Sequence, residues 1–246
     1  MAGGPGGSGL NRGSRLAPAR LRFATMEPAA RADLSRTWAL VPIRGLETSK
    51  TRLGGDLDPE ERLALVTELL RRTLVATREA RRITGTVVVT MDGDAAELAR
   101  RHEAVGLVER APGLNEAILA ARSLAAARGA TAVLILPADI PAVSAAAIDE
   151  LLGAADRAAR AKKAPAGTRG FVALVPDRHG AGTNALVLSP PDVVDPAFGI
   201  DSRVRHERSA RGAGARFQAM ESELSLDVDT SADLAAAEAA LGSLRG

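Results

Sequence analysis

The sequence predicts a single α/β domain with a mixed, mostly parallel sheet and helices on both faces. From residue 37 onward, short apolar runs alternate with helical segments of roughly 10–20 residues, a pattern typical of strand–helix–strand units on a parallel sheet. Two apolar runs, 171–176 and 184–189, are separated by only seven residues. A parallel crossover needs a longer connection, so this pair is predicted to be antiparallel. The chain has no internal repeat and no second apolar core.

The first half of the domain is predicted to alternate strands with helices. An apolar run starting at Trp38 ends in a Pro-Arg-Gly turn region and is followed by a long helix. Asp58 is the expected N-cap of that helix, Pro59 fits its first position, and apolar residues recur at helical spacing. A β-branched strand, a short helix and a brief apolar strand come next. The predicted ranges are 38–43, 59–82, 86–90, 94–101 and 107–108.

The second half continues the pattern. A helix closed by Gly129 leads into a buried strand, and Ser144 is the expected N-cap of the next helix. The antiparallel pair, a short strand and a closing helix follow. Segment 198–210 is rich in arginine and is interpreted either as an exposed basic loop or as an anion site. The predicted ranges are 114–128, 131–136, 144–159, 171–176, 184–189, 226–228 and 231–241.

Composition excludes several function classes. The chain has no cysteine, which rules out disulfides, cysteine-ligated metals and thiol nucleophiles. Aromatic residues make up only 2%, too few for a base-stacking platform, and no apolar run approaches the ~20 residues of a membrane span. The pI of 9.6 suggests nucleic-acid binding, but the net charge is only +2. Residues beyond 36 hold 26 basic and 28 acidic groups, so we expect neither a nucleic-acid nor a membrane partner.

Residues 1–36 are predicted to be a disordered leader before a domain at 37–246. The leader is rich in Gly, Pro, Ser and Arg and has no apolar period. It also lacks the apolar core of a secretory signal, so a cytoplasmic location is expected. We therefore expect that deleting residues 1–36 leaves folding and turnover intact.

Charged and hydroxyl residues follow several predicted strands, where ligands bind in open α/β sheets. Arg44, Lys50 and Arg52 follow the first strand, and the loop 177–183 carries Gly-Ala-Gly-Thr. Lysine is a compact point charge suited to phosphate, and a glycine-rich turn allows close approach to an anion. The alternatives are a solvated lysine and an ordinary hairpin turn. Cations and hydroxyls at one sheet edge favour a phosphorylated substrate.

Three aspartates predict a Mg²⁺ site at the same edge. Asp227 and Asp229 stand two residues apart on a predicted strand, which places both carboxylates on one face. Asp139 follows the strand at 131–136 and supplies a third carboxylate. Mg²⁺ is usually held by one or two carboxylates and substrate phosphates. The structural alternatives are that Asp229 caps the last helix and that Asp139 is a turn residue.

Five segments together resemble the guanylyltransferases of coenzyme F(420) biosynthesis, a family that includes enzymes acting on 2-phospho-L-lactate and on phosphoenolpyruvate. The resemblance covers about residues 37–241 and implies the fold of nucleotide-diphospho-sugar transferases. The segments are VPIRGLETSKTRL (41–53), LPADIP (136–141), HGAGTNAL (179–186), FGIDSRVRH (198–206) and LDVDTSADL (226–234).

The resemblance also implies roles for individual residues. Arg44 departs from the family, whose members often have lysine there, but it keeps the charge. Mg²⁺ would be held by carboxylates, the acceptor by small and hydroxyl residues, and GTP by cations and an amide. The implied sets are Asp139, Asp227 and Asp229 for the metal; Thr183, Gly199 and Ser202 for the acceptor; Arg44, Lys50 and Asn115 for the nucleotide; and Lys50 and Arg52 for catalysis beside the phosphates.

The implied reaction transfers GMP from GTP to phosphoenolpyruvate, giving enolpyruvoyl-diphospho-guanosine and pyrophosphate. The arginine-for-lysine bias and abundant Ala and Gly are typical of a high-GC bacterium, and the bacterial members resembled here favour phosphoenolpyruvate. The alternatives are 2-phospho-L-lactate or 3-phosphoglycerate as acceptor, a molybdopterin or sugar-phosphate acceptor, and a non-catalytic nucleotide-binding relative. The sequence does not fix the oligomeric state and leaves a homodimer open.

Overall fold

A seven-stranded mixed sheet forms the centre of the molecule, in the order β3-β2-β1-β4-β6-β5-β7. The computed structural model describes residues 32–50, 57–110, 113–161, 167–228, 230–242 and 244. β6 runs antiparallel to both of its neighbours, and every other strand pair is parallel. The mixed, mostly parallel sheet and the antiparallel pairing of β5 with β6 are as predicted. The strands are β1 (Thr37–Pro42), β2 (Ile83–Thr90), β3 (Val105–Val108), β4 (Ala132–Ile135), β5 (Phe171–Val175), β6 (Ala185–Ser189) and β7 (Arg216–Ala219).

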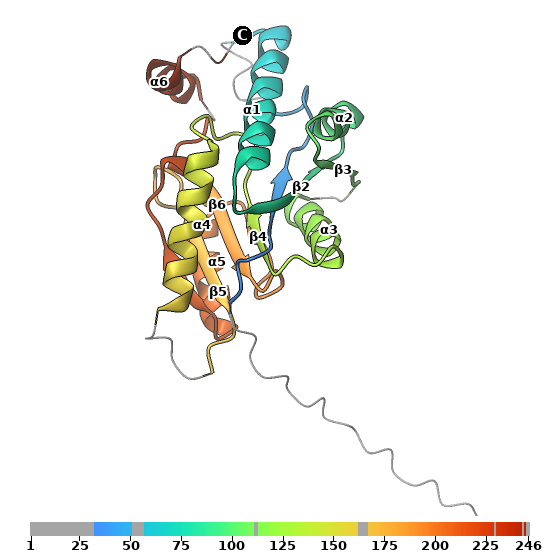
Figure 1. Ribbon diagram of the computed structural model, residues 1–246. Helices are drawn as coiled ribbons and strands as arrows, with labels where there is room; N and C mark the ends of the chain where they lie inside the picture. The colour runs from blue at the N-terminus through green and yellow to red at the C-terminus, as the bar shows by residue number, and fades with distance from the viewer. Residues whose placement is uncertain are drawn as a thin grey trace, which may run out of the picture.

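Helices cover both faces of the sheet and bury its apolar side chains (Figure 1). On one face lie α1 (Pro59–Glu79), α2 (Gly93–Arg101) and α4 (Ala145–Arg160). The opposite face carries α3 (Leu114–Ala127) and α5 (Ser202–Gly212). α6 (Ser231–Leu241) packs against α1 through a separate small cluster of leucines and valine. No helix among the described residues is long and apolar enough to cross a membrane.

The predicted helix starts are confirmed. The Asp58 carboxylate accepts the backbone N–H of Glu61, the Glu61 carboxylate accepts that of Asp58, and Pro59 opens α1. The Ser144 hydroxyl accepts the N–H of Ala147 at the start of α4. Each cap is worth about 1 kcal/mol because it pairs an N–H that has no partner inside the helix.

Three elements differ from the prediction. Residues 226–228 form no strand; a short 3₁₀ helix, Glu223–Ser225, precedes an extended stretch outside the sheet. The basic segment after Gly199 is the helix α5 rather than a loop, and β7 was not predicted at all. The sequence did not predict α5 because its buried residues are Ser202, His206 and Ala210, which give no apolar period. β7 is a short edge strand with no fully buried residue.

The packed fold begins before residue 37. Leu34, which the predicted leader included, is only 5% exposed and belongs to the core under α4. The Ser189 hydroxyl accepts the backbone N–H of Asp33 at 2.8 Å and donates to the Asp33 carbonyl at 3.0 Å. Residues 32–36 are therefore part of the domain. Residues 1–31 lie outside the described residues, and their disorder stays a prediction.

We expect truncations on either side of residue 32 to differ in stability. Removing residues 1–31 should change the free energy of unfolding by less than about 0.5 kcal/mol. Removing 1–36 deletes the buried Leu34 side chain, as Leu34→Ala does in part, and should lower stability by about 2–3 kcal/mol. Urea unfolding of the full chain and the three variants measures this. Equal stability of the two truncations would contradict a packing role for residues 32–36.

Candidate functional site

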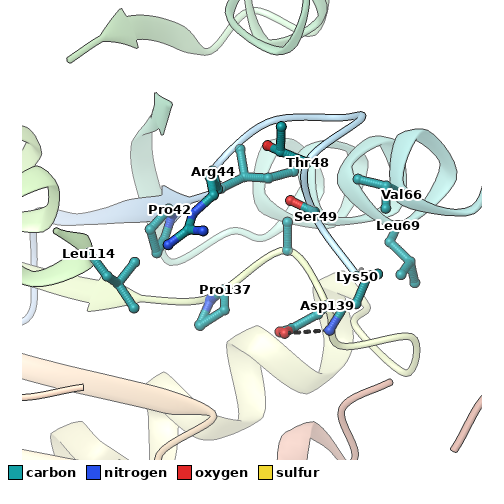
Figure 2. Close-up of a pocket in the computed structure, with 12 residues that line it drawn as sticks. Pro42, Arg44, Thr48, Ser49, Lys50, Val66, Leu69, Leu114, Pro137 and Asp139 are labelled. Carbon is teal, nitrogen blue, oxygen red and sulfur yellow. Dashed lines mark hydrogen bonds and ion pairs between the residues drawn. The ribbon is translucent and has the colours of Figure 1, made fainter. Parts of the chain in front are cut away.

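A cavity of about 490 Å³ opens beside β1, at the point where later strands are added on the other side of the sheet. β1 leads outward to β2 and β3 on one side, and β4 lies on its other side. Such a switch point, beyond the carboxyl ends of parallel strands, is where α/β sheets bind ligands. The cavity is lined by the residues that follow β1 and β4 and by parts of α1 and α3 (Figure 2).

The loop after β1 brings two of the predicted cations into this cavity. Arg44 and Lys50 both line it, and the Asp92 carboxylate fixes the loop by accepting the Leu46 N–H at 2.8 Å. Lys50 has a φ of 57°, a left-handed conformation that costs a non-glycine residue roughly 1–2 kcal/mol. Strain of this kind clusters at functional sites.

The predicted metal residue Asp139 faces Lys50 across the cavity. Lys50 Nζ lies 2.8 Å from Asp139 Oδ2, and their side chains are 9% and 32% exposed (Figure 2). In Figure 2, Leu114 lies at the end of the cavity opposite the Lys50–Asp139 pair, and Arg44 lies between the two ends. The lysine thus neutralises the carboxylate, and the sequence did not indicate this partner for Asp139.

The segment that carries Asp227 is tied directly to Asp139. The Val228 N–H donates to the Asp139 carbonyl at 3.0 Å, so the two acidic segments meet although 226–228 is no strand. The N-cap of α6 is Thr230, with a capping box to Asp233, which makes the capping alternative for Asp229 wrong. Asp229 itself lies outside the described residues, as does Arg52. Oxygen donors on two joined segments suit a hard cation.

Among the described residues no cluster of three or more His, Asp or Glu side chains could hold a metal. The described part of the predicted set is two aspartates, Asp139 and Asp227. Mg²⁺ needs only one or two carboxylates, because it takes its remaining ligands from phosphates and water. The predicted three-aspartate site stays a prediction.

A second polar group sits at the amino end of β6. Because Ile135 of β4 pairs with Leu186 of antiparallel β6, the start of β6 lies at the same sheet edge as Asp139. The predicted residues Thr183 and Ser202 meet there, with Ser202 Oγ donating to Thr183 Oγ1 at 2.9 Å. They come from the β5–β6 hairpin and the first turn of α5.

The segment before α5 is held by the side chains of Asn115 and Arg205. Both ends of the Asn115 amide bond to Phe198: Oδ1 accepts its N–H at 2.8 Å and Nδ2 donates to its carbonyl at 3.3 Å. Arg205 donates to the same carbonyl at 2.9 Å. Gly199 has a φ of 113°, which only glycine adopts readily. Asn115, predicted beside the nucleotide, thus positions the Gly199 segment in this structure.

His206 is the functional candidate that sequence reasoning missed. It is fully buried, 3.1 Å from Thr183 Oγ1 through Nδ1, and its Nε2 accepts the Ala197 N–H at 2.8 Å. Burial, and then the nearby Arg205 guanidinium, lower the pKa of His206 to about 4. The available signal was spacing: His206 follows Ser202 by four residues, which places both on one face of a helix.

Comparisons with known proteins identify the family of this chain. A family described as "Guanylyl transferase CofC like" matches residues 37–238. The chain belongs to this family. Among its relatives is the phosphoenolpyruvate guanylyltransferase of Sphaerobacter thermophilus, 40% identical over 80% of this chain and 90% of that protein. The phosphoenolpyruvate guanylyltransferase of Conexibacter woesei is 37% identical over 85% of this chain and 91% of that protein.

Solved structures share the fold of this guanylyltransferase-family chain. A putative nucleotide-diphospho-sugar transferase from Desulfovibrio desulfuricans superposes with a TM-score of 0.59 at 18% identity, covering 80% of this chain and 83% of the other. A 4-diphosphocytidyl-2C-methyl-D-erythritol synthase gives 0.56 at 14% identity, covering 84% and 99%. These likenesses confirm the predicted nucleotide-diphospho-sugar-transferase fold.

Proposed function

We propose that this chain transfers GMP from GTP to phosphoenolpyruvate, releasing pyrophosphate, in the biosynthesis of coenzyme F(420). Membership of the guanylyl transferase family supports the reaction type. The names of two relatives at 40% and 37% identity, both phosphoenolpyruvate guanylyltransferases, support the acceptor. The observation that carries the proposal is the switch-point cavity, which is lined by Arg44, Lys50 and Asp139, with Lys50 paired to Asp139.

The chemistry needs positioning and charge neutralisation more than proton transfer. An oxygen of the acceptor phosphate attacks the α-phosphorus of GTP, and the bond to the β-phosphate oxygen breaks as pyrophosphate leaves. A phosphate monoester is already largely deprotonated near neutral pH, so no general base is required. The described residues that line the cavity accordingly include cations and an aspartate but no histidine. Lys50 and Arg44 offset the charge that builds on the phosphates.

Mg²⁺ belongs to the proposal as a cofactor. Asp139 and Asp227, with Asp229 from the sequence, would hold it, and it would neutralise the phosphate oxygens. Lys50, which bonds to Asp139, would lie beside the same phosphates. Thr183, Gly199 and Ser202 would hold the acceptor.

A competition assay tests the acceptor. With GTP, Mg²⁺ and equal amounts of phosphoenolpyruvate, 2-phospho-L-lactate and 3-phosphoglycerate, we expect phosphoenolpyruvate to give the highest kcat/KM. Discrimination against phospholactate should be only about 10–200-fold, because the two differ in shape at one carbon. Mass spectrometry of the products and pyrophosphate release measure this.

Each other outcome has a defined meaning. A higher kcat/KM for phospholactate or phosphoglycerate contradicts the acceptor assignment and leaves guanylyl transfer standing. Pyrophosphate release only with a sugar phosphate or a molybdopterin acceptor contradicts the three-carbon substrate class. No pyrophosphate with any acceptor favours the non-catalytic alternative.

A further inference from the structure

Three buried side chains form a connected polar group at the start of β6. Thr183, Ser202 and His206 are 8%, 1% and 0% exposed. Thr183 Oγ1 lies 3.1 Å from His206 Nδ1 and 2.9 Å from Ser202 Oγ. Polar groups this deeply buried are stable only when their hydrogen bonds are satisfied, so the direction of each bond can be worked out.

The backbone fixes which ring nitrogen of His206 carries the proton. The Ala197 N–H can only donate, so the nitrogen it contacts, Nε2, must be unprotonated. The ring is neutral at neutral pH because its pKa lies near 4. Its single proton therefore sits on Nδ1, which faces Thr183. A backbone hydrogen bond to Ser202 acts on the same ring.

This tautomer decides what the hydroxyl pair can offer a ligand. A protonated Nδ1 has no lone pair, so Thr183 cannot donate its hydroxyl proton to His206 and can only accept from it. The two hydroxyl groups have one proton each, and one of these two protons is used in the hydrogen bond between Ser202 and Thr183. Within the described part of the chain, no other acceptor bonds to either hydroxyl. One proton is thus left to donate.

We propose that His206 is a positioning residue that makes the Thr183–Ser202 pair a hydrogen-bond donor to an anionic oxygen of the acceptor substrate. This inference rests on the proposed function for the identity of that substrate. With the opposite tautomer, Thr183 would donate to Nδ1 and the pair would present a lone pair, which repels a carboxylate or phosphate oxygen. The Ala197 N–H thus acts through His206 and Thr183 to make the hydroxyl pair favour an anionic ligand.

The tautomer can be observed without any substrate. The chain has three histidines, His102, His179 and His206, so ¹⁵N spectra of the imidazoles are simple, and His206→Gln identifies the signal. We expect a neutral ring protonated on Nδ1 from pH 7 down to about pH 5. A ring protonated on Nε2, or a cation at pH 7, would overturn the proposal.

Kinetics test whether His206 acts through Thr183. His206→Leu removes both ring bonds and should raise KM for phosphoenolpyruvate about tenfold, the factor for a hydrogen bond of ~1.4 kcal/mol, with KM for GTP within about twofold. His206→Gln keeps one donor and one acceptor and should restore most of the loss. In a Thr183→Val background, where the outward hydroxyl is already gone, His206→Leu should add little further.

Two competitors identify the anionic oxygen. Pyruvate carries the carboxylate of the substrate and methyl phosphate carries its phosphate, and Thr183→Val should weaken inhibition by one of them. Equal effects of His206→Leu on both KM values, independent addition of the His206 and Thr183 losses, or unchanged inhibition by both competitors would overturn the inference. Failure of the proposed function looks different: the wild type then releases no pyrophosphate with phosphoenolpyruvate, whatever the tautomer.

Discussion

Asp139→Asn and Asp227→Asn are each expected to reduce kcat/KM by at least about 100-fold. An amide keeps the shape of the side chain but loses the charge that attracts a divalent cation, so the loss is one of metal binding. The free energy of unfolding should change by no more than about 1 kcal/mol. The Lys50–Asp139 ion pair is partly exposed on the carboxylate side, and asparagine can still accept a hydrogen bond from Lys50.

A matched aspartate far from the cavity controls for the loss of an ion pair. Asp156 on α4 pairs with Arg160 at 2.8 Å, the same separation as Lys50 and Asp139, yet lines no part of the cavity. Asp156→Asn should therefore keep wild-type turnover. Mg²⁺ titrations of turnover and calorimetric Mg²⁺ binding with GTP measure the effect. Near wild-type rates at limiting Mg²⁺ in both cavity variants would refute the metal assignment.

The buried strands were predictable because their signal is local. β1, β2, β4, β5 and β6 are runs of mostly apolar or β-branched residues, and the short hairpin between β5 and β6 fixes their antiparallel pairing. Helix starts such as that of α1 were predictable for the same reason, since capping residues act within one turn. α5 carries no such signal. Its buried face holds a serine and a histidine, and only tertiary hydrogen bonds compensate for the burial of these polar side chains.

The site was predictable residue by residue but not in its connections. The sequence places Arg44, Lys50 and Asp139 after neighbouring strands, and the fold brings all three into one cavity. It does not indicate that Lys50 bonds to Asp139, because that pair joins residues 89 positions apart. Nor does it indicate that Asn115 binds the backbone of Phe198. Such pairings depend on the final register of the sheet, which composition and periodicity leave undetermined.

Substituting Lys50 should separate activity from stability. Lys50→Met removes the charge at the phosphates and should lower kcat by about 100–1000-fold, the range seen when one group that stabilises transition-state charge is lost. Lys50→Gly should lose as much activity. Its stability should stay within about 1 kcal/mol of wild type, because glycine relieves the φ of 57° while the ion pair to Asp139 is lost.

The neighbouring cation shows why charge alone is not enough at position 50. Arg44 also lines the cavity, and among the described residues it makes no ion pair with Asp139. Arg44→Lys keeps the charge and should cost only a few-fold in KM for GTP. Lys50→Arg should lower activity far more. The Lys50 side chain is only 9% exposed, and the space it fills does not fit a planar guanidinium. Initial rates over a range of GTP concentrations give kcat and KM for GTP, and urea unfolding of all four variants gives their stability. A Lys50→Met protein with kcat within about threefold of wild type would show that this strained lysine serves the fold rather than the phosphates.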